Sequence, residues 1–161
     1  MRKLLLTLIV AIFLTGCTCF YQPANIKADP QTKYYEHIRD WQIRDWQERD
    51  VSSVINFCLK YVVYTYDPPD HWQTYQEMIN SDFHGDCEDI ALFMAGTLRA
   101  LGYPYQIRIL LVKIIEGEHA MLKVELPNGK WRVYQTVDAP LWQIDVFVPI
   151  CEFDEKEIYT F

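Results

Sequence analysis

The sequence lacks a hydrophobic run long enough to cross a membrane. Its most apolar stretch, Leu4–Leu14, would cover about 16 Å as a helix, against about 30 Å of bilayer hydrocarbon. Positive charge is scarce as well: 15 Lys and Arg against 22 Asp and Glu give a formal net charge of −7, which argues against a nucleic-acid partner. A P-loop, a dinucleotide fingerprint and a Gly-x-Ser-x-Gly elbow are also missing. These absences disfavour a lasting transmembrane span, nucleic-acid binding and the enzyme classes that depend on those motifs.

The N-terminus has the layout of an export signal. Arg2 and Lys3 precede the apolar run, and the Leu-Thr-Gly-Cys sequence that ends at Cys17 resembles the lipobox of bacterial lipoproteins. The resemblance implies cleavage before Cys17 and lipid on that residue; an ordinary signal peptide with an incidental cysteine is the alternative. The expected location is the bacterial cell envelope, facing the periplasm or the exterior, with lipidated Cys17 as the membrane anchor. The expected organisation is a signal peptide over 1–16, a lipid-anchored linker over 17–32 and one domain over 33–161.

Half of the sequence is hydrophobic and 15% is aromatic, so the domain can build a core. Export also makes disulfides possible. Cys58 and Cys151 could pair or could be buried thiols, and the sequence leaves both open. Cys87 has the more chemical surroundings, because three carboxylates lie beside it at positions 86, 88 and 89.

Helical signals fill the first part of the domain. The tandem repeat RDWQIRDWQERD, residues 39–50, predicts an amphipathic helix that partly buries Ile38, Trp41 and Trp46. Apolar residues at helical spacing over 54–62 predict a second helix, and a capping box that begins at Thr74 predicts a short third one.

The most regular predicted helix begins with Cys87. Asp86 is a good N-cap, and Gly102 and Pro104 end the helical pattern. The period then changes to two. It predicts strands over 105–115, 119–126, 131–138 and 142–148. Helices followed by an antiparallel sheet indicate an α+β fold.

A predicted hairpin brings two chemical residues together. A two-residue loop at Asn128-Gly129 would pair position 127 with 130, and would then place His119 opposite Asp138. An aspartate there can accept a hydrogen bond from the imidazole and fix its tautomer. Asp138 as a strand-end turn residue is the competing interpretation. Strict alternation would also turn His119 away from the apolar face, unless a bulge near Glu118, a strong twist or a register shift intervenes.

Cys87 would open its helix, where backbone N–H groups favour a thiolate. That contribution is only about 0.3–1 kcal/mol at an exposed site, and the neighbouring carboxylates oppose it. A protonated His119 or a bound cation would supply the missing positive charge. The resulting hypothesis is a triad of thiol nucleophile, histidine base and aspartate. The alternatives are a buried structural thiol, a zinc site through His84 and Cys87 that lacks a second ligand pair, and acidic residues that merely cap the helix.

Four segments carry a resemblance to a known family. They are WQTYQEM (72–78), GDCEDIA (85–91), RALGYPYQIRIL (99–110) and the hairpin from HAMLKVE to NGKWRVYQTVD (119–138). Together they resemble the transglutaminase-like superfamily, and most of all the bacterial transglutaminase-like cysteine peptidases. The resemblance implies a papain-like α+β fold in which the nucleophile helix packs on a C-terminal antiparallel sheet. It also implies catalytic Cys87, His119 and Asp138.

Exported members of this family can bind calcium through acidic residues that flank the cysteine, here Asp86 and Glu88; the chemistry itself requires no cofactor. The sequence thus predicts a thiol hydrolase or acyltransferase that acts on amide bonds of a protein or peptide. Hydrolysis and cross-linking share an acyl-enzyme, so the sequence does not choose between them. The alternative is an inactive lipoprotein that uses the same fold as a binding or assembly module.

Overall fold

The structure is a computed structural model that describes residues 30–41, 43–66, 71–115, 117–136 and 147–161. The predicted signal peptide, Cys17, the linker as far as residue 29 and Asp138 lie outside these ranges. So does most of the strand predicted over 142–148. Among the described residues, every helix falls short of the length and apolar content needed to cross a bilayer.

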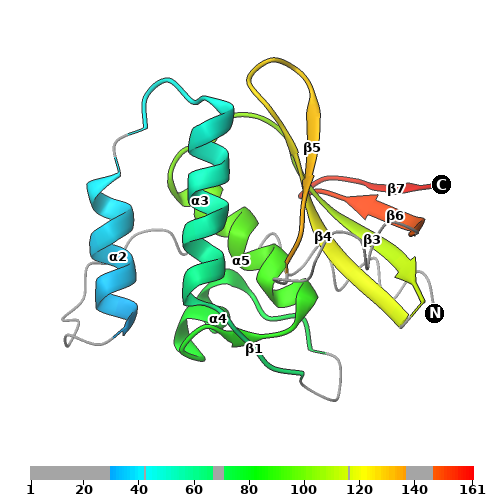
Figure 1. Ribbon diagram of the computed structural model, residues 1–161, viewed down its shortest axis with the longest axis horizontal. Coiled ribbons are helices and arrows are strands. Elements are labelled where there is room, and N and C mark those ends of the chain that lie inside the picture. Colours follow the sequence, from blue (N-terminus) through cyan, green and yellow to red (C-terminus); the bar gives the residue numbers. More distant parts are fainter. Residues whose placement is uncertain (1–29, 42, 67–70, 116, 137–146) are drawn as a thin grey trace.

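The helices precede the main sheet along the chain, which confirms the α+β class. They are α2 (Pro30–Asp40), α3 (Glu48–Tyr61), α4 (Tyr75–Asn80) and α5 (Cys87–Ala100). The main sheet contains β3 (Ile107–Ile114), β4 (Gly117–Glu125), β5 (Trp131–Tyr134), β6 (Val148–Phe153) and β7 (Ile158–Thr160). Its strands are antiparallel neighbours in the order β5-β4-β3-β6-β7. Figure 1 shows the helices together on one side of this sheet.

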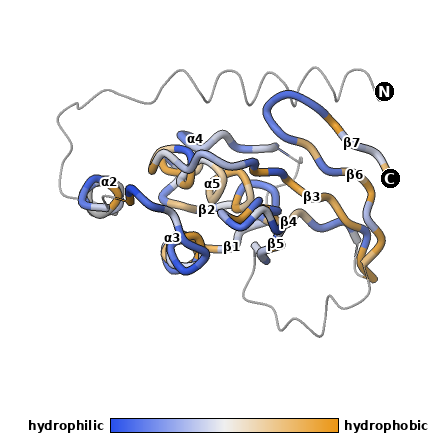
Figure 2. Tube along the Cα trace, turned by 90° about the horizontal axis from the view of Figure 1, so that it is seen from above, coloured by the Kyte–Doolittle hydropathy of each residue, from blue (hydrophilic) through white to orange (hydrophobic). Residues whose placement is uncertain are grey.

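The core lies around α5. Seven of its apolar residues are buried, and Thr97 is buried with them: Ile90, Ala91, Leu92, Phe93, Met94, Ala95 and Leu98. The facing side chains of β4, Ala120, Leu122 and Val124, belong to the same cluster. In Figure 2 the hydrophobic colouring accordingly runs through α5 and the inner strands. α5, which begins with Cys87, therefore packs on the antiparallel sheet, as the sequence predicts.

The tandem repeat does not form one helix, which corrects that prediction. α2 ends at Asp40 and α3 begins at Glu48, with a non-helical connection between them. Trp46 is buried edge-on against Tyr103, and Trp41 packs on Phe57. In one helix the two tryptophans would lie about 140° apart. The break lets both indoles point into the core.

The β4–β5 register differs by one residue from the predicted one. Leu122 pairs with Tyr134 and Glu125 with Trp131, so paired positions sum to 256 rather than 257. The N–H of Leu126 donates to the carbonyl of Lys130, and Gly129 has φ +78°. The loop therefore has three residues and ends in a left-handed glycine, a common alternative to the two-residue turn. The two-residue turn from which the sequence placed His119 opposite Asp138 is therefore not the one formed. β5 ends at Tyr134 and Asp138 lies outside the described residues, so the proximity of His119 and Asp138 stays a prediction.

All cysteines among the described residues, Cys58, Cys87 and Cys151, are free thiols. Cys58 is fully buried in α3 and Cys151 is partly exposed on β6, so the structure contradicts the possibility that they pair. Burial raises the pKa of the Cys58 thiol to about 12. Cys58 belongs to the hydrophobic core of the domain.

Candidate active site

A tight turn between α4 and α5 places Cys87 at the first position of α5. Thr74 caps α4, and its hydroxyl accepts from the N–H of Glu77 at 3.2 Å, which confirms the predicted capping box. After α4 the chain passes through Asp82 and Phe83, both in the left-handed region at φ 53° and 64°. Such conformations cost energy in residues other than glycine, and the burial of the Phe83 ring in the core offsets that cost.

Two close approaches fix the helix start. A Cβ on Gly85 would lie 2.6 Å from the Asp89 Cβ and 2.8 Å from the Met78 sulfur, so this position has no room for a side chain. The Asp89 carboxylate accepts from the backbone N–H of Gln73 at 2.7 Å, from its side-chain amide at 2.9 Å and from the N–H of Asp86 at 3.2 Å. Asp89 is fully buried and joins the segment before α4 to the first turn of α5. It is a structural residue.

The Cys87 thiol is half-buried and protonated. Its Sγ donates to Oε2 of Glu88 at 3.1 Å. Burial raises the pKa of Cys87 to about 12; the hydrogen bond from the Ala120 backbone lowers it, and the hydrogen bond and charge of Glu88 and the charge of Asp86 raise it. As predicted, the neighbouring carboxylates oppose ionisation of the thiol. In the metal-free protein, burial and these carboxylates outweigh the backbone hydrogen bond, and the Cys87 pKa is raised.

His119 lies on β4, directly before Ala120, whose backbone contacts the Cys87 sulfur. It is buried, and burial lowers its imidazole pKa, while a hydrogen bond with Gln135 raises it. Nε2 of His119 and Oε1 of Gln135 are 3.2 Å apart. Gln135 comes directly after β5, where the strand leaves the sheet. The amide oxygen of Gln135 can accept from Nε2–H and hold the ring in one tautomer.

Because β5 ends early, the start of α5 can contact the backbone of β4. β5 ends at Tyr134. Beyond it, the Thr136 hydroxyl donates a hydrogen bond to the Ala120 carbonyl at 2.8 Å. The sulfur therefore meets the backbone of β4 where β5 no longer covers it. β3 and β4 pair without interruption from Ile107–Val124 to Ile114–Gly117, which excludes a bulge at Glu118 in that ladder. The one-residue shift in the β4–β5 register changes the partners of β4 but not the face to which His119 points.

The candidate metal residues also come together. One ligand atom each from Asp86, Cys87 and Glu88 lie within 4.8 Å of one another, the only such group found among the described residues. Two buried carboxylates at one point provide the hard oxygen donors that calcium prefers, whereas the thiol does not suit it. Nδ1 of His84 instead lies 3.0 Å from the Thr65 hydroxyl, outside this group, which leaves the zinc alternative without support. Asp138 lies outside the described residues.

Sequence reasoning missed three contributors to this site. Gln135 carried no motif, because a glutamine at a strand end has many ordinary roles. Ala120 acts through its backbone, which no side-chain pattern reports. The two-residue strands β1 (Val63–Tyr64) and β2 (His84–Gly85) pair in parallel just before α5, and strands this short leave no periodicity to read.

Comparisons with known proteins agree with this architecture. The sequence profile of the transglutaminase-like superfamily matches residues 32–136, and the chain belongs to that superfamily. No curated protein matches the chain at a significant level. LapG from Legionella pneumophila superposes with a TM-score of 0.67 at 21% identity, over 93% of this chain and 86% of that one.

A calcium-bound form of the same LapG gives the same TM-score at 20% identity, over the same share of each chain. A candidate cysteine protease from Cytophaga hutchinsonii has a TM-score of 0.58 at 18% identity, over 76% of this chain and 41% of that one. These likenesses confirm the transglutaminase-like fold.

Proposed function

We propose that this protein is an exported, lipid-anchored cysteine hydrolase or acyltransferase that acts on amide bonds of a protein or peptide. Cys87 would attack the carbonyl carbon, and His119 would take the thiol proton and pass it to the leaving amine. Asp138 would orient the imidazole. The observation that carries the proposal is the contact of the Cys87 sulfur with the backbone of Ala120, one residue from His119. The superfamily and a fold shared with a candidate cysteine protease support it.

The resting protein holds its proton on sulfur. The difference between the Cys87 pKa of about 12 and the ordinary histidine value of 6.5 is 5.5, and the pKa of His119 lies lower still. At about 1.4 kcal/mol for each pKa unit, transfer of the proton to His119 costs more than about 7 kcal/mol. A charge that offsets Glu88 and Asp86 would reduce this cost. The metal-free protein should therefore be nearly inactive.

Calcium is the proposed source of that charge. Asp86 and Glu88 would hold it, and a bound cation would favour the thiolate by neutralising both carboxylates. The calcium-bound form of LapG, a protein of the same fold, supports this choice of metal. The role of the chain's own residues is unchanged: Cys87 forms the acyl bond and His119 moves the proton.

A second function has one observation in its favour. A thiol with a pKa of about 12 that donates to Glu88 also suits a protein that has given up catalysis. The domain would then bind or assemble with partners at the membrane, and calcium would not change the reactivity of Cys87.

Iodoacetamide labelling distinguishes the two functions. With calcium present, Cys87 should be alkylated at least tenfold faster than Cys151 or Cys58, and His119→Ala should abolish the difference. Peptide mass spectrometry measures all three rates in one sample. Equal rates for Cys87 and Cys151 with calcium would refute the enzyme and favour the binding module. Isothermal titration of EGTA-treated protein tests the metal itself, and the absence of heat on adding calcium would refute that site.

A further inference from the structure

The small β1–β2 sheet leaves one pair of main-chain groups unused beside Cys87. The N–H of Val63 donates to the Phe83 carbonyl at 3.0 Å, and that of Thr65 to the Gly85 carbonyl at 2.8 Å. Residues that alternate along a strand point their polar groups to opposite neighbours. Tyr64 therefore directs its N–H and C=O away from β2, and neither has a hydrogen-bond partner among the described residues.

The other side of this sheet is closed. The N–H of His84 donates to the Ser81 carbonyl at 3.3 Å, and the His84 carbonyl accepts from the Gln73 side-chain amide at 3.0 Å. Within the described part of the chain, the sheet can therefore gain a strand only along β1. An unpaired N–H and C=O on the edge of a sheet are a ready attachment point for another strand.

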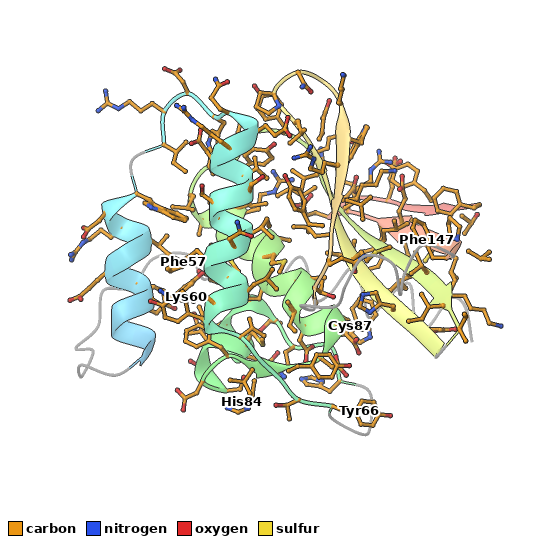
Figure 3. The ribbon with its side chains drawn as sticks, viewed as in Figure 1. Phe57, Lys60, Tyr66, His84, Cys87 and Phe147 are labelled. Carbon is orange, nitrogen blue, oxygen red and sulfur yellow. The ribbon has the colours of Figure 1, made fainter. Side chains whose placement is uncertain are left out.

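This open edge lies next to the candidate nucleophile. Tyr64 pairs with Gly85, and Gly85 precedes Cys87 by two residues. Burial raises the pKa of the Tyr64 phenol, and the charges of Cys87 and Asp86 raise it further, which agrees with that proximity. In Figure 3, Tyr66, just beyond β1, and Cys87 both lie at the end of the molecule where α5 begins.

Three of the four exposed side chains along this edge are apolar or aromatic, and the fourth is Thr65. Val63 is 47% exposed, Tyr64 55% and Tyr66 71%. We propose that β1 is the docking strand for the substrate polypeptide, which binds in an extended conformation and makes main-chain hydrogen bonds to the N–H and C=O of Tyr64. Apolar substrate side chains would lie against Val63 and Tyr66. This inference rests on the proposed function and assigns its substrate class: an extended, unfolded segment rather than a folded surface or a free amino acid. Addition of a peptide strand to an open sheet edge is a known mode of recognition.

Two electrophiles of different length test the docking strand. An acetylated tetra-alanine chloromethyl ketone can occupy the edge, whereas acetyl-alanine chloromethyl ketone cannot reach it. With calcium present, the longer reagent should alkylate Cys87 of the wild-type protein about tenfold faster, as expected for two main-chain hydrogen bonds. Tyr64→Pro, which removes the N–H at an outward-facing position, should lose this advantage. Tyr64→Ala, which keeps the N–H, is the matched control and should retain most of it.

Labelling with iodoacetamide distinguishes failure of the docking strand from failure of the proposed function. If it labels Cys87 quickly but the longer ketone has no advantage, or keeps its advantage in Tyr64→Pro, the docking strand is refuted and the proposed function survives. If every reagent labels Cys87 no faster than Cys151, the proposed function fails and the docking strand fails with it. Should Tyr64→Pro not fold, a series of tetra-alanine ketones methylated at one backbone nitrogen each gives the same answer on wild-type protein. Methylation of one particular nitrogen should remove the rate advantage of the longer ketone, whereas methylation of the nitrogen before or after it should not.

Discussion

Replacing Glu88 by Gln should make the Cys87 thiol easier to ionise. With a pKa of about 12, the thiolate is about one part in 10⁴ at pH 8. Glu88 contributes to that pKa twice, because its carboxylate accepts the S–H hydrogen bond at 3.1 Å and because its charge repels the thiolate. An amide of the same shape keeps an acceptor but carries no charge. We expect the pKa to fall by about one unit, and the thiolate fraction to rise about tenfold.

The assay is the rate of iodoacetamide labelling at pH 8 in EGTA, so that no metal masks the carboxylate. Glu118→Gln provides a matched control. The charge of Glu118 contributes to raising the pKa of Cys151, so this substitution should speed the labelling of Cys151 and leave Cys87 unchanged. An unchanged Cys87 rate in a folded Glu88→Gln protein would refute the electrostatic account of the site.

Three further predictions concern other parts of the structure. Gln135→Glu should raise the pKa of His119 by about one unit or more, because a carboxylate replaces the amide oxygen on Nε2; the shift of the His119 ring proton signals with pH measures it, and a lowered pKa would contradict the assigned contact. Because the folded pKa of Cys58 exceeds the unfolded value, wild-type stability should be intact below about pH 8.5 and fall above it. Between pH 8 and 10 the unfolding free energy of the wild type should fall by about 2 kcal/mol more than that of Cys58→Ala. Urea unfolding under reducing conditions measures both, and equal losses would contradict the burial of a protonated thiol. Glu152→Ala should cost about 3 kcal/mol of unfolding free energy, because it strands the cations paired with a nearly buried carboxylate; Cys87 labelling should not change, and a loss below 1 kcal/mol would refute the network.

The sequence predicted the parts of the site that depend on local signals. An acidic N-cap, an apolar stripe and a closing glycine are enough to specify α5, so Cys87 lies where the pattern places it. The strand that carries His119 follows from its alternation in the same way. Each of these elements encodes its own geometry within a few residues.

The parts that failed depend on choices between nearly equal local structures. Asn-Gly suits a two-residue turn, but a three-residue loop with Gly129 in the left-handed region has almost the same sequence requirements, and one extra loop residue shifts every pair. The tandem repeat has helical composition throughout. Burial of Trp46 against Tyr103 outweighs continuation of the helix, and no local pattern reports a contact 57 residues away in the chain.

Acylation of Cys87 by p-nitrophenyl acetate, followed by intact-protein and peptide mass spectrometry with calcium present, tests the central claim most directly. The account predicts an acetyl thioester on Cys87 that forms and turns over in the wild-type protein, forms slowly and persists in His119→Ala, and is absent in Cys87→Ala. Acetylation of Cys87 no faster than that of Cys151, or turnover unaffected by His119→Ala, would contradict it.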